Sequence, residues 1–280
     1  MGVVKVGFFD RRVFKIFLQG TSALSVALST LLLFVSIPEE CKLHALAAFA
    51  IVLTFIYVVV WIWANKLRRV EIGIDGSSVT IKVGDIFKQP GFKAIAFNEY
   101  FDTQVDNSLI SEESLNGIYL KFHLTTDVSD LDRRIDIFPF ETDEIVDENH
   151  NRRHGKKRRH RLGTIFVNGE FLLVAMSKFD DSNRAILTMP EYLEFLVRFW
   201  DRVNKVYAQK SVAVPVFGSG ITRIKGHKSI GDEDLLKIML WTFRISEMRF
   251  KYPAKLTIVI HDAKIDQINL LDMKLLNNGV

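Results

Sequence analysis

The sequence predicts two N-terminal transmembrane helices followed by a three-layer α/β domain. Two long uncharged apolar runs lie within the first 64 residues. From about residue 70 onward, short apolar segments alternate with segments of helical period, a pattern typical of a sheet buried on both faces. That remainder of about 210 residues is long enough to bury one core of its own.

The two apolar runs comprise residues 16–37 and 43–64, and each is 22 residues without a formal charge. At about 1.5 Å per residue each run spans roughly 33 Å, enough to cross a hydrocarbon core of about 30 Å. The second run ends in Tyr57, Trp61 and Trp63, side chains typical of the headgroup level. Residues 38–42 are expected to form a hairpin turn outside the bilayer.

Basic residues predict the orientation of these helices. The segment between the runs contains a single lysine, whereas lysines and arginines gather on the outer sides of both runs. They are Lys5, Arg11, Arg12, Lys15, Lys66, Arg68 and Arg69. By the positive-inside rule both termini lie in the cytoplasm, which predicts a multi-pass protein of the inner (plasma) membrane.

Serines follow one face of the first run, at Ser22, Ser25, Ser29 and Ser36. Such a stripe predicts close helix packing within or between protomers, so a homo-oligomer is expected. A sharper alternative is that the stripe lines a pore when several protomers cluster. Neither run contains an aspartate, glutamate, lysine or arginine, which argues against an ion-coupled transporter.

The expected elements of the C-terminal domain follow from its apolar segments and turn residues. Strands are expected at 79–83, 92–97, 117–122, 164–167, 170–176, 211–217 and 255–261, and helices at 190–209 and 232–250. Asn168-Gly169 is a strong hairpin signal between two of these strands. Pro190 suits the first position of a helix, and the apolar residues that follow it form one face.

A strongly charged segment at 141–161 interrupts this pattern. Residues 141–150 are acidic and residues 152–161 are basic, which predicts a solvated, mobile loop. A basic cluster near a bilayer can also attract anionic lipid headgroups. No aromatic residues are interleaved with the charges, so nucleic acid is not an expected partner.

The passage Gly218-Ser219-Gly220 directly follows an apolar strand and precedes Arg223. Glycines in this position let the backbone N–H groups approach phosphate oxygens, with the arginine adding positive charge. A plain turn is the alternative. The histidines are scattered without metal-ligand spacing, and the single cysteine, Cys41, lies between the apolar runs. The sequence therefore predicts no metal, no cofactor and no catalytic residue.

Several of these stretches resemble a known family. Val83-Gly84-Asp85-Ile86, the hairpin at 162–180 and the stretch at 212–224 together resemble a macro domain. The phrases at 97–103, 114–117 and 218–224, behind two transmembrane helices, resemble the membrane-bound macro-domain effectors of Thoeris antiphage defence, the ThsA family. The fold class is therefore expected to be two transmembrane helices followed by an α/β three-layer macro-like domain, with the anchor at 1–69 and the domain at 70–280.

That resemblance implies a function. In such systems a partner TIR-domain enzyme consumes NAD to make an ADP-ribose-derived signal. The macro domain binds this signal, the protein oligomerises, and its helices disrupt the membrane. The resemblance thus implies a nucleotide-binding receptor rather than an enzyme.

Residue by residue, the resemblance implies three parts of a site. Asp85 and Ile86 match the positions that contact adenine. Gly218, Ser219, Gly220, Ile221 and Thr222, followed by Arg223, match the loop that wraps the diphosphate. Asn98 and Asp102 fall where ADP-ribose hydrolases have an asparagine-rich loop followed by glycines, and this chain has no glycine run there.

Other interpretations stay open at this level. Asp85, Asn98 and Asp102 are also residues that ordinary turns favour. A membrane-tethered hydrolase of ADP-ribose is the main alternative function. A structural anchor that recruits a partner through residues 152–161 is the third.

Overall fold

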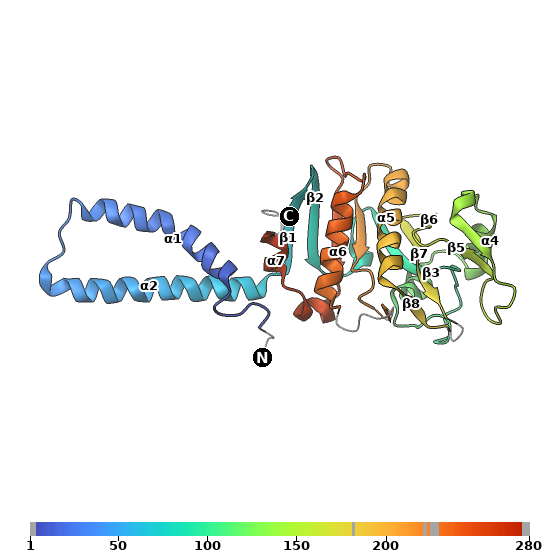
Figure 1. Ribbon diagram of the computed structural model, residues 1–280, viewed down its shortest axis with the longest axis horizontal. Coiled ribbons are helices and arrows are strands. Elements are labelled where there is room, and N and C mark those ends of the chain that lie inside the picture. The colour runs from blue at the N-terminus through green and yellow to red at the C-terminus, as the bar shows by residue number, and fades with distance from the viewer. Residues whose placement is uncertain (1–3, 181–182, 221–222, 225–229, 276–280) are drawn as a thin grey trace. The chain divides into compact units, whose positions relative to one another are not determined.

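The computed structural model describes residues 4–180, 183–220, 223–224 and 230–275 (Figure 1). Their contacts divide the chain into two compact units. The helical unit is Met1–Val70 together with Ile265–Val280, and the sheet unit is Glu71–Lys264. The C-terminal residues from Ile265 onward therefore belong with the N-terminal helices, although they follow the sheet unit in sequence.

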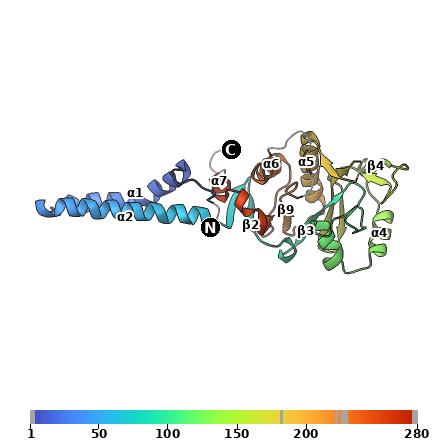
Figure 2. The same cartoon turned by 90° about the horizontal axis from the view of Figure 1, so that it is seen from below.

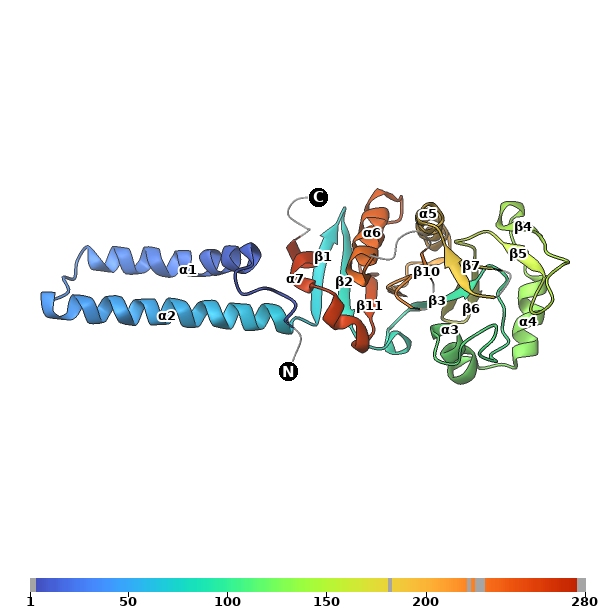
Figure 3. The same cartoon turned by 60° about the horizontal axis from the view of Figure 1, so that its bottom comes forward.

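The helical unit contains α1 (Arg11–Leu32) and α2 (Glu39–Lys66), which run side by side (Figures 1 and 3). By length and composition, both helices satisfy the requirements for crossing a membrane. Asp10 caps α1, its carboxylate accepting a hydrogen bond from the backbone N–H of Arg12 at 2.8 Å. The apolar side chains of α2 are mostly exposed, among them Leu43, Ile51 and Phe55.

The helix boundaries differ from the expected ones at the turn. Helix α1 ends at Leu32, so residues 33–37 of the first apolar run lie outside it. Helix α2 begins at Glu39, so most of the expected turn at 38–42 is helical. Pro38 stands immediately before this helix, and Glu39 and Glu40 lie in its first turn, where negative charge favours the helix dipole.

Within the described part of the chain, the sheet has nine strands in the order β1-β2-β11-β9-β3-β7-β8-β10, with β6 paired to β7. Its strands are β1 (Arg69–Ile74), β2 (Ser77–Val83), β3 (Phe92–Asn98), β6 (Ile165–Asn168), β7 (Phe171–Phe179), β8 (Ala185–Leu187), β9 (Val212–Pro215), β10 (Arg223–Ile224) and β11 (Leu256–Ile260). Strands β2, β11, β9, β3 and β7 are all mutually parallel along this order. The hairpin at Gly169 is confirmed, because β6 pairs antiparallel with β7.

Helices cover both faces of the sheet, as the three-layer prediction requires (Figure 2). On one face lie α5 (Met189–Val206) and α6 (Asp232–Ile245). On the other lie α3 (Leu115–Ile118), the π-helix Tyr119–His123 and α4 (Val128–Ile137). Tyr119, Leu131 and Ile135 pack there against Ile95 and Leu173 of the sheet.

Helix α5 begins where the sequence predicts and carries a complete capping box. Thr188 accepts from the backbone N–H of Glu191 at 3.4 Å, and the Glu191 carboxylate accepts from the backbone N–H of Thr188 at 2.7 Å. Pro190 occupies the first turn. Trp200 and Phe199 on its inner face are fully buried.

The strand expected at 117–122 is wrong, because these residues are helical. Ser114 caps α3 by accepting from the backbone N–H of Gly117 at 3.2 Å. A Cβ at Gly117 would lie 2.2 Å from the Ser111 carbonyl oxygen, so the glycine serves close packing of this turn. The apolar residues after it face the sheet from a helix, which a short apolar run does not distinguish from a strand.

The mobile loop expected at 141–161 is also wrong. These residues form a 3₁₀ turn, Thr142–Glu144, and an antiparallel hairpin of β4 (Ile145–Glu148) and β5 (Arg158–His160). Its acidic part pairs with α5, where Arg202 contacts Glu141 at 2.8 Å and Glu144 at 2.5 Å. Several of these charges are thus paired with defined partners, although most of the segment remains exposed.

Candidate functional site

The residues predicted to bind a nucleotide follow the carboxyl ends of neighbouring parallel strands. Asp85 comes after β2, Gly218 comes after β9, and Asn98 ends β3. Because β2, β11, β9 and β3 are adjacent and parallel, these positions share one edge of the sheet. Three inter-strand spacings separate β2 from β3, about 14 Å at the usual strand distance. Open α/β sheets bind ligands at this edge.

Asp85 is held in a turn that is anchored to the sheet. One carboxylate oxygen accepts a hydrogen bond from the backbone N–H of Phe87 at 2.9 Å, which caps the 3₁₀ helix Ile86–Lys88. The Asp85 side chain remains 43% exposed. Ile86 is buried against Ala213 and Val259. The turn is therefore rigid at Ile86 and open to solvent at Asp85.

Side chains of α5 and α6 contact the glycine loop, which is the segment Gly218-Ser219-Gly220 and the residues next to it. The hydroxyl of Tyr192 donates to the Phe217 carbonyl at 2.8 Å, and the backbone N–H of Ser219 donates to the Val216 carbonyl at 3.2 Å. Gly218 has a φ of +85°, and a Cβ there would lie 3.3 Å from Leu235 Cδ1. A side chain at this position is disfavoured by both the backbone conformation and the packing.

The remaining residues of this loop are described only in part. The turn at Gly218 and Ser219 is followed by Gly220, where a Cβ would meet nothing within 4 Å. Ile221 and Thr222 lie outside the described residues. The backbone of Arg223 belongs to β10, and its side chain is not described.

Asn98 and Asp102 bond to one another rather than facing outward. The Asn98 amide nitrogen donates to Asp102 Oδ2 at 2.9 Å. The side-chain oxygen of Asn98, Oδ1, accepts hydrogen bonds from the backbone N–H groups of Tyr100 and Asp102, at 3.0 and 3.3 Å. Both side chains are buried. These contacts close the loop at the end of β3 into a compact turn.

Residues of the β4–β5 hairpin also contact this turn. We call the contacts of Asp102 with Asn98, Arg152 and Lys156 the lock. Arg152 forms a bidentate pair with Asp102, its Nη1 donating to Oδ1 at 2.9 Å and its Nη2 to Oδ2 at 2.6 Å. The two side chains are 7% and 1% exposed. The guanidinium also lies 3.9 Å from the centre of the Tyr100 ring. This is a buried, stacked, charge-assisted contact, the strongest kind that an arginine makes.

Two further residues of the hairpin tip contact Asp102. The backbone N–H of Lys156 donates to Asp102 Oδ1 at 2.8 Å. Gly155 has a φ of +85°, and a Cβ there would lie 2.5 Å from the same oxygen. Asp102 therefore accepts four hydrogen bonds in all from Asn98, Arg152 and Lys156. Sequence reasoning missed Arg152 and Gly155, and the only local signal was a glycine inside a basic run.

Glu99 and His160 are buried beside this lock. The His160 backbone N–H donates to the Glu99 carbonyl at 2.7 Å, and Nδ1 of its ring lies 3.2 Å from that oxygen. Burial raises the pKa of Glu99 to about 7, against the opposing charges of Arg159 and Lys178. Burial likewise lowers the pKa of His160 to about 4. Both side chains are therefore expected to be largely neutral at about pH 6.

The described residues contain no cluster suited to a metal ion. Among them, no three histidine, cysteine, aspartate or glutamate side chains lie close enough together to hold one.

Comparison with known proteins places these features in a family context. Residues 79–261 match the family model described as "Thoeris protein ThsA, Macro domain". The chain is also similar to the Thoeris protein ThsA of Bacillus amyloliquefaciens (strain Y2), at 38% identity over 256 residues. That similarity covers 89% of this chain and 84% of the relative.

Solved macrodomain structures from Oceanobacillus iheyensis are also similar to this chain. One macrodomain mutant has a TM-score of 0.46 at 14% identity, covering 76% of this chain and 95% of that one. A second mutant, solved with ADPR, has a TM-score of 0.44 at 13% identity, covering 74% and 97%. The macrodomain solved with ADP has a TM-score of 0.43 at 14% identity, covering 74% and 95%.

Proposed function

This chain belongs to the family of Thoeris ThsA proteins with a macro domain, and from this membership we propose that it is a membrane-anchored receptor-effector of antiphage defence. The sheet unit binds an ADP-ribose-derived signal that a partner TIR-domain enzyme makes from NAD. Binding favours self-association, and the clustered helices disrupt the bilayer. Both termini face the cytoplasm, where this signal is produced.

The observation that carries the proposal is the arrangement along the carboxyl edge of the sheet. The exposed carboxylate of Asp85 suits an exocyclic amino group at one end, and the constrained turn at Gly218 and Ser219 suits phosphate oxygens in the middle. At this edge about 14 Å separates β2 from β3, so the proposed ligand lies across three inter-strand spacings. Ile221, Thr222 and Arg223 complete the diphosphate loop in this proposal.

The membrane part of the proposal rests on the exposed apolar surface of the helical unit. Leu43, Ile51 and Phe55 each expose more than half of their surface, and they lie on a helix of 28 residues. A water-soluble protein rarely exposes a contiguous apolar surface of this length. The lipid bilayer is the partner that buries it at least cost.

The lock at Asp102 favours a receptor over a hydrolase. A general base must present a free carboxylate to water or substrate. The Asp102 carboxylate instead accepts hydrogen bonds from Asn98, Arg152 and Lys156. Asn98 is equally engaged. The loop at the end of β3 therefore holds a fixed conformation, and the Asn98 and Asp102 side chains are already occupied by hydrogen bonds within the protein.

The test is calorimetric titration of the full chain in detergent with ADP-ribose, ADP and the products of a TIR-domain NAD-consuming enzyme. The same samples are followed for ligand loss and particle size. Tight binding without turnover, together with growth in size, supports the receptor. Turnover of the ligand supports the hydrolase instead, and absence of binding to every nucleotide refutes the site.

A matched pair of variants ties binding to the edge of the sheet. Gly218→Val is expected to abolish binding, because valine disfavours a φ of +85° and contacts Leu235. Gly73→Val is the control, since a Cβ at Gly73 meets nothing within 4 Å and β1 lies three places from β9 in the strand order. Equal binding by both variants would remove the glycine loop from the site.

A further inference from the structure

The residues that follow the sheet unit in sequence return to the two N-terminal helices. Helix α7 (Leu270–Leu275) belongs to the helical unit. Leu271 is fully buried there in an apolar cluster with Val6, Val13 and Ala64. This cluster joins the N-terminal segment, α1, α2 and α7 within one small core.

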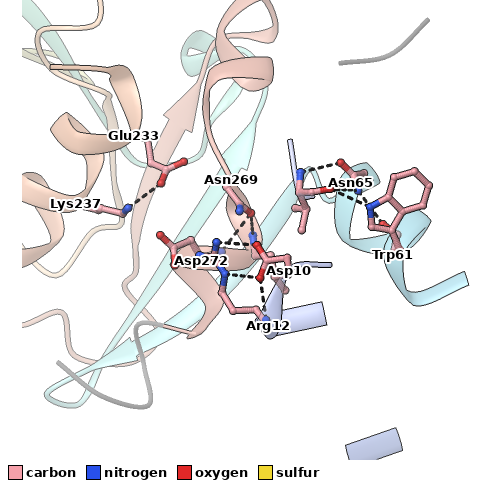
Figure 4. A network of polar contacts seen from close by, with 10 residues as sticks. Asp10, Arg12, Trp61, Asn65, Glu233, Lys237, Asn269 and Asp272 are labelled. Atoms are coloured by element: carbon pink, nitrogen blue, oxygen red, sulfur yellow. Dashed lines mark hydrogen bonds and ion pairs between the residues drawn. The ribbon is translucent and has the colours of Figure 1, made fainter. Parts of the chain in front are cut away.

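Polar contacts reinforce this junction at the first turn of α1 (Figure 4). Arg12 pairs with Asp272 of α7 through Nη1. The same guanidinium bonds to Asp10, the cap of α1, through Nε at 3.0 Å and Nη2 at 2.9 Å. Asn269 accepts from the backbone N–H of Leu271 at 3.0 Å and so holds the start of α7 in place. Arg12 thereby connects α7 directly to the N-terminal end of α1.

The N-terminal segment is attached to the end of α2 by a second set of bonds. The side-chain oxygen of Asn65 accepts from the backbone N–H groups of Lys5 and Val6, at 2.9 and 3.0 Å. The indole N–H of Trp61 donates to the Val6 carbonyl at 2.9 Å. Figure 4 shows these bonds on α2 and the Arg12 contacts on α1. We call the contacts of Leu271 and Asp272 with the helical hairpin the clasp.

Both chain crossings between the two units lie in regular structure. One is strand β1, which starts at Arg69, shortly after α2 ends at Lys66. The other is the 3₁₀ helix Asp262–Gln267, which follows β11 and leads to α7. Ile265 and Ile268 in this connection are buried. Neither crossing has the glycine- and serine-rich composition of a flexible linker.

The two crossings contact the hairpin in different ways. Strand β1 starts shortly after α2, whereas the connection after β11 contacts α1 through the clasp. Among the described residues this connection also contacts the N-terminal segment and α2, through the ion pair of Asp266 with Lys5 at 3.5 Å and through Lys274 over the Trp63 ring. Strand β11 lies between β2 and β9, and its carboxyl end shares the edge with Asp85 and Gly218. The chain therefore leads from this edge, through α7, to the contacts of Leu271 and Asp272 with α1.

We propose that the clasp is the coupling element that makes α1 follow the sheet unit, so that nucleotide binding at the sheet edge changes the whole membrane hairpin. This proposal rests on the proposed function, because it takes the sheet edge as the nucleotide site. A ligand acts on a distant element only through contacts that differ between two arrangements. The clasp supplies such contacts for α1, whose chain connection to the sheet unit otherwise runs through α2.

The test uses the single cysteine as a reporter. Cys41 is exposed in the first turn of α2, at the opposite end of the hairpin from the clasp. The full chain is labelled there with an environment-sensitive fluorophore and reconstituted in vesicles of phosphatidylethanolamine and phosphatidylglycerol. ADP-ribose is then titrated while its binding and the fluorescence are measured on the same sample. Four proteins are compared: wild type, the double variant Leu271→Ala/Asp272→Asn, the conservative Asp272→Glu, and Asp130→Asn.

Asp130 pairs with Arg133 on the surface of α4, so Asp130→Asn makes the same chemical change outside the clasp. Wild type, Asp272→Glu and Asp130→Asn are expected to show a ligand-dependent change in fluorescence. The double variant is expected to bind ADP-ribose with unchanged affinity and to lose that change.

The remaining outcomes refute the proposal in distinguishable ways. A double variant that binds ADP-ribose and keeps the full fluorescence change shows that the clasp does not couple, and it leaves the proposed function intact. The coupling is equally refuted if wild type binds ADP-ribose without any change at Cys41. A wild type that binds neither ADP-ribose nor the products of a TIR-domain NAD-consuming enzyme overturns the nucleotide site, and with it the coupling that depends on that site. Loss of binding only in the double variant also refutes it, because the clasp would then support the fold of the site.

Discussion

Replacing Arg152 with alanine removes the central donor of the lock at the end of β3. The change leaves the Asp102 carboxylate buried with two hydrogen bonds, from Asn98 and the backbone of Lys156, and without an opposite charge in contact. It also removes the guanidinium that stacks on Tyr100. We therefore expect a large loss of stability from a residue that lies in a strongly charged surface segment.

The magnitude follows from the geometry of the pair. Removing one partner of a buried ion pair costs about 3–5 kcal/mol, because the other charge stays buried and uncompensated. Both partners are less than a tenth exposed, so solvent screening reduces this value little. For a domain of this size, each kcal/mol lowers the melting temperature by roughly 2–4 °C. The sheet unit of Arg152→Ala is therefore expected to melt about 6–20 °C below the wild type.

The assay is thermal unfolding of the full chain in detergent, followed by near-ultraviolet circular dichroism. Arg153→Ala is the matched control, because Arg153 is exposed and directly adjacent in sequence. Arg152→Lys is expected to fall in between, since a lysine keeps the charge and loses the bidentate fork. If Arg152→Ala and Arg153→Ala melt at the same temperature, the lock contributes nothing and the argument for a rigid distal loop fails.

Three further outcomes are expected. Gly155→Ala should destabilise the sheet unit by about 1–3 kcal/mol, because φ is +85° and the new Cβ would lie 2.5 Å from Asp102 Oδ1. Gly169→Ala is the control, since φ is also positive there and a Cβ meets nothing within 4 Å. Equal denaturant midpoints for the two variants would contradict a packing role for Gly155. Glu99→Gln should flatten the dependence of stability on pH. Because the pKa of Glu99 is raised to about 7, the folded protein keeps a proton that the unfolded chain releases between pH 4.5 and 7, and the stability of the wild type falls across this window by up to about 3 kcal/mol. Parallel curves of stability against pH for the two proteins would refute this. The opposite contribution of His160, whose lowered pKa favours the fold above pH 6.5, is present in both proteins and cancels in their difference. Asp85→Asn should weaken ADP-ribose binding roughly tenfold and leave the melting temperature near that of wild type, because asparagine still caps the turn; unchanged affinity by calorimetry would remove Asp85 from the site.

The parallel strands of the sheet core and the long helices were predictable from local pattern, whereas β1, β4, β5, β8 and β10 were not predicted. The continuous apolar segment 211–217 contains the observed strand Val212–Pro215. The helix expected at 190–209 from its apolar face corresponds to α5, Met189–Val206. The prediction of secondary structure was wrong where an apolar run was too short to show a helical or strand periodicity. Residues 117–122 are helical because Ser114 caps a turn that Gly117 allows to pack closely, and neither contact is visible in composition.

The site was predictable in outline only. Asp85 and Gly218 follow strands, and strand ends were readable from the sequence. The role of the segment 141–161 was not, because its charges looked solvated until their partners were placed. Arg152 and Asp102 lie 50 residues apart, and no period or local motif links residues at such a separation.

Local properties of the chain, namely uncharged runs of sufficient length, apolar period and turn residues, were enough to predict two membrane-length helices, the α/β class and the strand that precedes the glycine loop. Those properties act between residues near in sequence, where chain geometry alone dictates which side chains meet. The pair of Asp102 with Arg152 and the pair of Arg12 with Asp272 join residues that are 50 and 260 positions apart in sequence, and only the folded chain brings them together. Their energy depends on burial and on partner geometry, and both are properties of the folded molecule.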